Sequence, residues 1–429
     1  MTTVSGTGTP AVHAARPKRK LPRAMILVGL GVILLSIVRV VADADDLTSA
    51  GSFSAAIRLG VPILLAGLGG LFAERCGVVN IGLEGMLILG TWFGAWGAVE
   101  FGAWEGVLLG IFGGALGGLI HAVATVTFGV DHIVSGVAIN ILGAGMARYL
   151  SVVSWVGKGT GGGATQSPKV TVDIAKVDVP FLAGGSIFGW DTPDVLGRIA
   201  SWRWVVISDV AGLLRGLTGN LSLLSFVALL LVPASVLFLW HTPLGLRLRS
   251  AGENPYAAES LGVNVYRMKY LGVITSGALA GLGGAFLVLE GAGIYREGQT
   301  GGRGFIGLAA LIFGNWRPTG VAMGAGLFGF ADALRLRNES AVHALLLFVA
   351  VAAALAALWL LFDRRYRYGA VIGAIAVGFG IWYVTSDTVP RQFLSFTPHI
   401  TTLLVLAFAT QRLRPPAADG LPYRKGGGT

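Results

Sequence analysis

Long apolar runs with few charges recur along the whole chain. About twelve of them read as helices across a lipid bilayer, which take about 20 apolar residues each. Their approximate bounds are 24–41, 53–73, 83–99, 104–128, 132–152, 221–240, 268–290, 304–314, 318–335, 341–362, 369–386 and 394–411. Because the bilayer core holds no water to satisfy backbone polar groups, only helices and closed barrels span it. The sequence therefore predicts an all-α polytopic membrane protein.

Charged residues are few, and their positions indicate which kinds of molecule the protein binds. Charged residues make up 13% of the chain, about half the fraction that is usual in soluble proteins. The formal charge of +10 would suit a nucleic-acid binder, but the lysines and arginines cluster beside apolar runs, where they set membrane topology. We therefore expect the lipid bilayer as a partner and no nucleic acid.

The sequence carries no pattern typical of an enzyme. The single cysteine, Cys76, excludes an internal disulfide, and no metal-ligand spacing surrounds it. The stretch GKGTGGGATQS fails as a phosphate-binding loop, because Val152 and Gly159 occupy positions that need Gly and Ser or Thr. The histidines are scattered, and no Ser/His/Asp or Cys/His grouping stands out. We expect no catalytic site, no metal site and no cofactor in this chain.

The basic residues also predict which side of the membrane each segment faces. Residues 1–23, rich in Thr, Gly, Ala and Pro, read as a disordered basic tail, and Arg39 favours a retained first span over a cleaved signal peptide. With that tail in the cytoplasm, alternation of the spans also places residues 241–267 and the C-terminal residues 415–429 there. Residues 154–220 then form an extracytoplasmic loop region. Both termini are expected in the cytoplasm.

Glycine spacing predicts close helix contacts and a candidate repeat. Gly110, Gly114 and Gly118 recur every four residues, a spacing that lets two helix backbones approach closely. Two segments, GLGGLFAERC from Gly67 and GLGGAFLVLE from Gly281, each precede a polar interruption and a further apolar run. In the predicted topology they run in opposite directions, as do inverted repeats with broken helices in transporters.

A polar segment, LRLRSAGENPYAAESLGVNVYRMKY at 246–270, separates two very apolar runs. Asn254 is a good N-cap, Pro255 suits the first helical position, and Gly262 suits the residue just past the helix end. Isolated helices shorter than about 12 residues are barely stable in water, so this short helix needs a surface to dock on. A separate protein is one candidate for that surface. An ordinary interhelical loop with a single turn is the alternative.

The same segment resembles the cytoplasmic coupling loop of a transporter family. Gly252, Asn254, Ala257, Ala258 and Gly262 are similar to residues of the permease subunits of ABC importers, in the branch that serves simple sugars, branched-chain amino acids and nucleosides. The resemblance extends to GGLFAERCGVVNIGLEGM, VDHIVSGVAINIL, GRGFIGLAALIFGNWRPTG, GFADALRLR and the closing TPHITTLLVLA and GLPY. These motifs are most similar to nucleoside permeases that work with a basic-membrane-protein-type lipoprotein.

This resemblance implies a fold and a set of partners. About ten core transmembrane helices would occupy residues 24–335 and 393–414, and a helical pair within 338–392 would be an insertion. Two permeases, identical or paralogous, would assemble in the bacterial cytoplasmic membrane with two ABC ATPase subunits, which bind the ATP and Mg. An extracytoplasmic lipoprotein would deliver the substrate. The residues that would couple to the ATPase are Gly252, Glu253, Asn254, Ala257, Ala258 and Gly262.

Polar side chains at membrane depth are candidates for the substrate path, because burying them there is costly. These candidates are Asn80, Glu84, Asn140, Gln299 and Arg303. The alternative role for each is to cap a helix or to satisfy backbone groups. Asp131 is expected to cap the helix that follows it. Asp332 is expected to pair with Arg335, three residues further along the same helix, rather than with substrate.

Three functions remain open from the sequence. The first is a nucleoside permease driven by a separate ATPase, and the second is the same machine for simple sugars such as ribose or for branched-chain amino acids. The third, of another class, is an autonomous secondary transporter or channel. Genes for an ATPase and a lipoprotein beside this one would favour the first two.

Overall fold

The computed structural model describes residues 23–171, 173–187, 189–337, 339–387, 389 and 413–426. The predicted N-terminal tail up to residue 22 and the predicted last span at 394–411 lie outside these residues.

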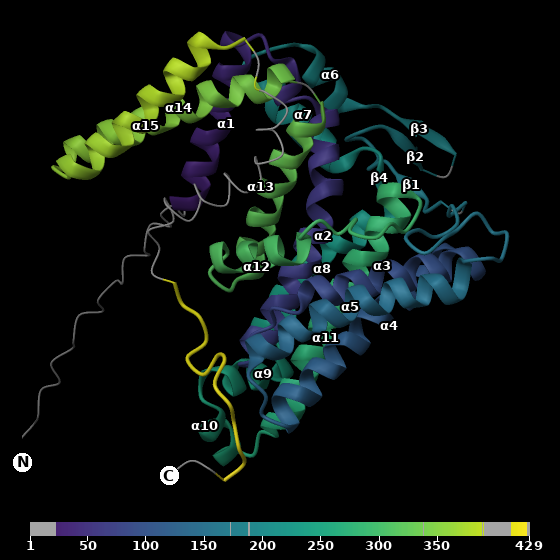
Figure 1. The fold of residues 1–429 in the computed structure, drawn as a ribbon. Coiled ribbons are helices and arrows are strands. Elements are labelled where there is room, and N and C mark those ends of the chain that lie inside the picture. The colour runs from purple at the N-terminus through teal and green to yellow at the C-terminus, as the bar shows by residue number, and fades with distance from the viewer. Residues whose placement is uncertain are drawn as a thin grey trace, which may run out of the picture.

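Fifteen α-helices form within the described residues (Figure 1). The longer ones are α1 Arg23–Val41, α2 Ala50–Arg75, α3 Leu83–Glu100, α4 Ala103–Ala122, α5 His132–Trp155, α8 Leu223–His241, α11 Val265–Phe286, α13 Pro318–Arg337, α14 Glu339–Phe362 and α15 Tyr366–Thr385. The shorter ones are α6 Val195–Ser201, α7 Ile207–Thr218, α9 Pro243–Glu253, α10 Pro255–Ser260 and α12 Arg303–Phe313. A 3-10 turn, η1 Asp45–Leu47, precedes α2, and the π-helical turns η2 Val123–Thr127 and η3 Leu287–Ala292 extend α4 and α11.

Seven helices in the described part of the chain are long and apolar enough to cross a membrane. They are Ala50–Arg75, Ala103–Thr127, His132–Trp155, Leu223–His241, Val265–Ala292, Ala341–Phe362 and Tyr366–Thr385. The protein is therefore a multi-pass membrane protein, as predicted. The expectation of a full span at 304–314 is wrong, because α12 has only 11 residues before Gly314 ends it. At 1.5 Å per residue that is about 17 Å, roughly half of the bilayer core.

The prediction of a purely α-helical chain needs a small correction in the region between α5 and α8. Four short strands lie there: β1 Lys176–Val177, β2 Gly185–Ile187, β3 Trp190–Thr192 and β4 Leu221–Ser222. They form two antiparallel pairs, β1 with β4 and β2 with β3. Periodicity gave no sign of strands of two or three residues.

The core is built around two long helices, α2 and α11. α2 packs along α13, α11 and α12, whereas α11 packs along α4, α3 and α2. The α2–α3 segment corresponds to the α11–α12 segment, because in each a long helix is followed by a break in the helix and then by a shorter helix. Large buried side chains such as Leu65, Leu68 and Phe286 fill the space around them.

The predicted close approach of the glycine-rich helix is confirmed. α4 crosses α11 at Gly114 and Gly118, where an added Cβ on Gly114 would overlap the Gly277 carbonyl oxygen and one on Gly118 would lie 2.6 Å from the Val273 oxygen. α2 and α13 cross in the same manner, with a Cβ on Gly60 placed 2.9 Å from the Ala325 oxygen. Glycine at these crossings lets the backbones touch directly.

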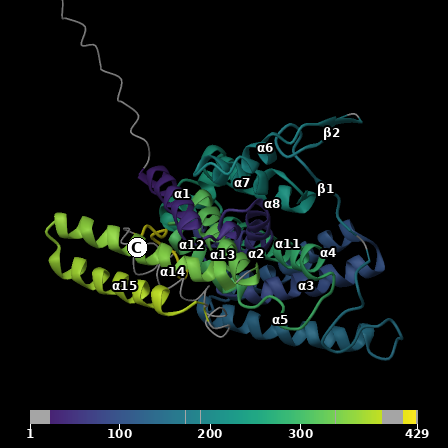
Figure 2. The same cartoon turned by 90° about the horizontal axis from the view of Figure 1, so that it is seen from above.

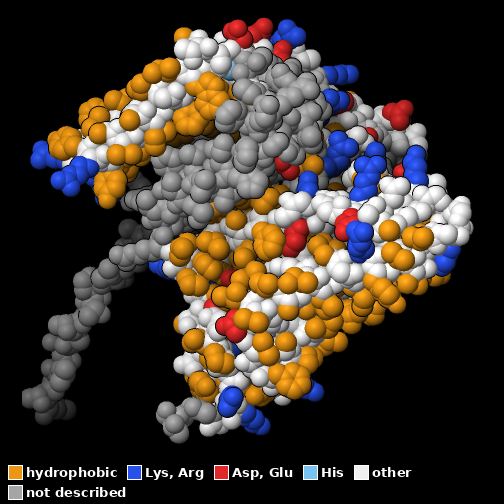
Figure 3. Space-filling view, in the orientation of Figure 1, with side chains coloured by type: hydrophobic (Ala, Val, Ile, Leu, Met, Phe, Trp, Pro, Cys, Tyr) orange, Lys and Arg blue, Asp and Glu red, His pale blue; other side chains and the backbone are white. Residues whose placement is uncertain are grey.

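Helices α14 and α15 lie side by side, away from α3, α4 and α5 (Figure 2). They occupy the region that was predicted as an inserted pair. Their outward side chains are apolar, among them Trp359, Phe362 and Val371, which are 65%, 86% and 62% exposed. Hydrophobic side chains cover the visible face of this hairpin, and basic side chains gather at its tip (Figure 3). Such a surface suits lipid.

Candidate functional site: two helix breaks and a short helix

The chain leaves the helix between α2 and α3, and Asn80 lies at the centre of this first break. Its side chain is fully buried. The Asn80 Nδ2 donates to Ser276 Oγ of α11 at 2.8 Å, and its Oδ1 accepts from the Gly82 N–H at 3.0 Å. One amide thus fixes the loop backbone and ties the break to α11.

A second amide supports the same break from α5. The Asn140 Oδ1 accepts from the Gly85 N–H at 2.7 Å, and its Nδ2 donates to the Ile81 oxygen at 3.1 Å. The backbone groups that the break leaves without helical partners are satisfied in this way. Asp131 caps α5 as predicted, with Oδ1 accepting from the N–H groups of Ile133 and Val134.

Two histidines also contact this break, and they were not among the sequence candidates. The His121 Nε2 lies 3.1 Å from the Val79 oxygen, and its Nδ1 lies 2.8 Å from Ser135 Oγ. The Val79 N–H donates to His132 Nδ1 at 3.3 Å. Both histidines are buried, so the rule that ionisable side chains at membrane depth are functional candidates could have found them.

Glu84 joins the first break to the second one, which lies between η3 and α12. Its Oε1 accepts from Thr300 Oγ1 at 2.6 Å and from the Gly302 N–H at 2.9 Å. Its Oε2 accepts from the Gly304 N–H at 2.7 Å. A buried carboxylate therefore sits at the start of α12, where free N–H groups and the helix dipole favour negative charge. Thr300 is the partner that the sequence analysis missed.

Gln299 and Arg303 lie beside this junction and are partly buried. The Arg303 Nη1 donates to the Thr300 oxygen at 3.0 Å, and its Nη2 lies 3.6 Å from Asp332 Oδ2 of α13. Asp332 thus contacts Arg303, whereas the side chain of Arg335 lies outside the described residues. Among the described atoms, the buried Gln299 Nε2 and Arg303 Nε have no hydrogen-bond acceptor. These two donors lie beside the loop that Glu84 contacts.

The short helix predicted in the polar segment is present as α10. The Asn254 Oδ1 accepts from the Ala257 N–H at 3.0 Å, Pro255 takes the first helical position, and Gly262 has a φ of +82°. Ala257 is exposed and Ala258 is buried, so α10 has one face free and one face packed.

The rest of the polar segment also forms a helix, which the sequence analysis missed. α9 is capped by Thr242, whose Oγ1 accepts from the Gly245 N–H at 3.0 Å. Its Glu253 Oε1 lies 3.7 Å from Arg75 Nη1 at the end of α2, and a Cβ on Gly252 would overlap the Arg75 carbonyl oxygen. The Thr-Pro pair before α9 was the signal for its start.

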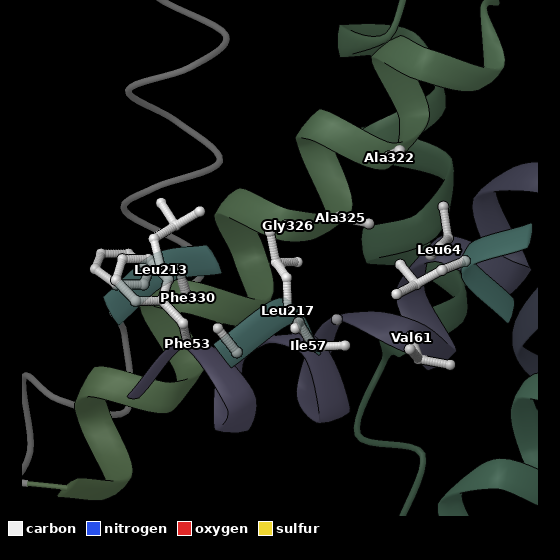
Figure 4. A pocket seen from close by; sticks show the side chains of 13 residues that line it. Phe53, Ile57, Val61, Leu64, Leu213, Leu217, Ala322, Ala325, Gly326 and Phe330 are labelled. Atoms are coloured by element: carbon white, nitrogen blue, oxygen red, sulfur yellow. The ribbon is translucent and has the colours of Figure 1, made fainter. Parts of the chain in front are cut away.

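A large cavity elsewhere is apolar and does not fit a polar substrate. It encloses about 250 Å³ between α2, α7, α8 and α13 (Figure 4). Its lining consists of hydrocarbon and aromatic side chains and glycine, with Phe53 and Phe330 at one end and Leu64 at the other. Such walls offer no side-chain hydrogen bonds to a sugar or a base.

The chain matches one family of transporter subunits over most of its length. The family model described as "Branched-chain amino acid transport system / permease component" matches residues 52–337. The guanosine ABC transporter permease protein NupQ of Bacillus subtilis (strain 168) is 34% identical over 373 residues, which cover 85% of this chain and 93% of NupQ. The chain belongs to this permease family. It is the permease component of an ABC transporter, a transport subunit that is not catalytic.

Two further relatives of this permease differ in their named substrates. The nucleoside ABC transporter permease protein NupC of Lactococcus lactis subsp. cremoris (strain MG1363) is 30% identical over 371 residues. The putative glucose ABC transporter permease protein TsgC13 of Haloferax volcanii is also 30% identical, over 368 residues. Each alignment covers 85% of this permease and 93% of the relative. No solved structure matches the permease.

Proposed function

We propose that this permease translocates nucleosides across the bacterial cytoplasmic membrane, driven by separate ATPase subunits that bind the ATP and Mg. The observation that carries the substrate class is the similarity to guanosine and nucleoside permeases over 85% of the chain. Simple sugars are the second candidate, because a putative glucose permease is similar over the same share of the chain. An extracytoplasmic lipoprotein delivers the substrate, and a second permease, identical or paralogous, completes the pair.

The substrate path in this proposal runs past the junction of the two breaks. Asn80, Glu84 and Asn140 hold the first break in place, and Gln299 and Arg303 supply free donors beside the second. The carbonyl and hydroxyl oxygens of a nucleoside can accept from such donors. The correspondence of the α2–α3 segment with the α11–α12 segment supports an inverted repeat with broken helices. In this arrangement α12, with 11 residues, crosses only about half of the bilayer. The core has about ten spans, and both termini face the cytoplasm.

In the same proposal α10 is the site that an ATPase subunit pushes. Its exposed face carries Tyr256 and Ala257, its neighbour Leu261 is 84% exposed, and its buried face rests on the rest of the permease. Gly252, Glu253, Asn254, Ala258 and Gly262 shape the helix and its attachment. An exposed large apolar side chain next to a rigid short helix suits binding to another protein.

Substrate competition tests the proposal. Cells that carry the permease with its partner subunits are given labelled guanosine together with an excess of an unlabelled nucleoside, glucose, ribose or leucine. We expect uptake to need ATP and to be blocked by other nucleosides, with little effect of the sugars or leucine. Uptake that is blocked by sugars instead would assign the permease to the second candidate, and uptake without ATP would refute both.

A further inference from the structure

The C-terminal residues 413–426, which we name the tail, lie along the end of the molecule that carries α9 and α10 (Figure 1, yellow). Residues 415–429 were predicted as a cytoplasmic tail, and their GLPY motif, which ends at Tyr423, is one of those that resemble nucleoside permeases. Its start is held near the loop between α12 and α13, because the Arg414 N–H donates to Asn315 Oδ1 at 2.8 Å.

The far end of the tail packs against α10. Tyr423 is only 8% exposed, and its ring centroid lies 5.4 Å from that of Tyr256 of α10 and 5.4 Å from that of Tyr266 of α11. Tyr423 belongs to a small separate core with Ala251, Ala258 and Val265. The buried face of α10 therefore rests partly on a tail residue.

The middle of the tail packs against the first helix break. The Ala418 N–H donates to the Gly252 oxygen at 2.9 Å, and the Ala418 oxygen would lie 3.2 Å from a Cβ on Gly77. Gly420 lies against Val79, since a Cβ there would be 3.4 Å from Val79 Cγ2. The Asp419 carboxyl lies near the Glu74 carboxyl at the end of α2.

The tail thus adds a second link between α10 and the break between α2 and α3. α10 packs on α9 and on the start of α11, and α9 itself touches the break, because a Cβ on Gly77 would lie 3.2 Å from the Gly252 Cα. Tail residues contact both α10 and the break. Val79, which the tail contacts, directly precedes Asn80 in the break. Asn80 adjoins the proposed substrate path. A helix of six residues is barely stable alone. The surface on which α10 packs therefore determines which part of the permease moves with it.

We propose that Tyr423 is a positioning residue for coupling: it holds α10 against the tail, and the tail carries the movement of α10 to the break between α2 and α3. This inference rests on the proposed function, in which an ATPase subunit pushes α10. ATP hydrolysis and substrate movement are then linked through the tail as well as through α9 and α11, which are joined covalently to the two ends of α10.

Three variants in the complete transporter test this inference. Tyr423→Ala removes the ring, Tyr423→Phe keeps it, and Leu421→Ala is the matched control because Leu421 is 57% exposed in the same tail. We expect Tyr423→Ala to keep the bound ATPase and its ATP hydrolysis but to lower the substrate moved per ATP by about tenfold, a typical size for a coupling effect. Tyr423→Phe and Leu421→Ala should match the unmodified protein. A purely structural role would not change the ratio of transport to hydrolysis.

The outcomes separate this inference from the proposed function. If the unmodified permease binds no ATPase, the proposed function fails. If it does and Tyr423→Ala still transports with the normal ratio, the tail does not couple. Loss of the ATPase from Tyr423→Ala would also overturn the inference, because the tail would then belong to the docking surface.

A cross-link covers the case in which Tyr423→Ala does not reach the membrane. Cys76 is the single cysteine of the chain, so Cys76→Ser gives a background for Tyr256→Cys with Tyr423→Cys. Before cross-linking this variant lacks the Tyr423 ring, so we expect it to move little substrate per ATP. Joining the two positions with a short bismaleimide should restore that ratio, because the link holds α10 to the tail. A ratio that does not change on cross-linking would contradict the inference.

Discussion

Glu84 holds the two helix breaks together through three hydrogen bonds, all to the start of α12 or the loop before it. Thr300 lies 216 residues away in the sequence, so nothing local predicted this contact. The sequence placed Glu84 at membrane depth and left its partner open. The structure shows that it anchors a half-length helix by its N-terminus.

Replacing Glu84 tests this anchoring. Glu84→Gln should lower both the melting temperature and nucleoside uptake, because an amide NH2 cannot accept the Gly304 N–H and a charge-assisted hydrogen bond contributes about 1.5–3 kcal/mol. Uptake should fall about tenfold or more at an unchanged membrane level. Glu100→Gln, at the exposed end of the same helix, is the control and should change neither quantity. Normal uptake by Glu84→Gln would show that the junction is not needed for transport.

Asp419 gives the tail a dependence on pH. Burial raises the pKa of the Asp419 carboxyl from 3.8 to about 7, although Glu74 and the charges of Lys269 and Arg75 oppose that rise. Because the raised pKa favours the protonated form in the docked tail, docking is strongest below about pH 4. It weakens as the pH rises from about 4 to about 7 and levels off above that.

Hydrogen exchange measures this effect. In the purified protein, the amides of residues 413–426 should exchange faster at pH 8 than at pH 6 after correction for intrinsic rates. Asp419→Asn removes the charge and should make protection nearly equal at the two pH values. Equal protection in the unmodified protein would contradict the raised pKa of Asp419.

At the scale of elements, the glycine crossings fix how the helices pack. Gly114 of α4 faces Gly277 of α11, so Gly114→Val forces the backbones apart and should cost about 1–3 kcal/mol of stability. The matched control is Gly145→Val, because a Cβ on Gly145 of α5 meets no atom within 4 Å. Thermal unfolding in detergent should show a lower melting temperature for the first variant only. Equal melting temperatures would mean that the α4–α11 crossing tolerates separation.

The elements also show what local sequence can and cannot predict. Apolar runs predicted α2, α4 and α11 because the bilayer sets the length of a span, and a cap, a proline and a glycine predicted α10. The expected bounds of 304–314 are close to those of α12, but a run of eleven residues is too short to count as a complete span. The docking of the tail was missed because its hydrogen bonds to the rest of the chain are made with residues 99 to 167 positions away.

At the scale of the whole molecule, the permease has a membrane part with seven clear candidate spans in the described residues and one end that presents α10. Its buried polar groups are held by hydrogen bonds between helices, and its similarity to guanosine, nucleoside and glucose permeases covers most of the chain. The central claim is that α10 receives an ATPase subunit.

Purification from the native membrane in mild detergent tests that claim most directly. The permease is isolated unmodified, as Ala257→Asp on the exposed face of α10, and as Ala175→Asp, an exposed alanine beside β1 that serves as control. We predict that an ABC ATPase co-purifies with the unmodified protein and with Ala175→Asp, and that it is lost from Ala257→Asp while the permease level stays normal. An ATPase that remains bound to Ala257→Asp would contradict the claim.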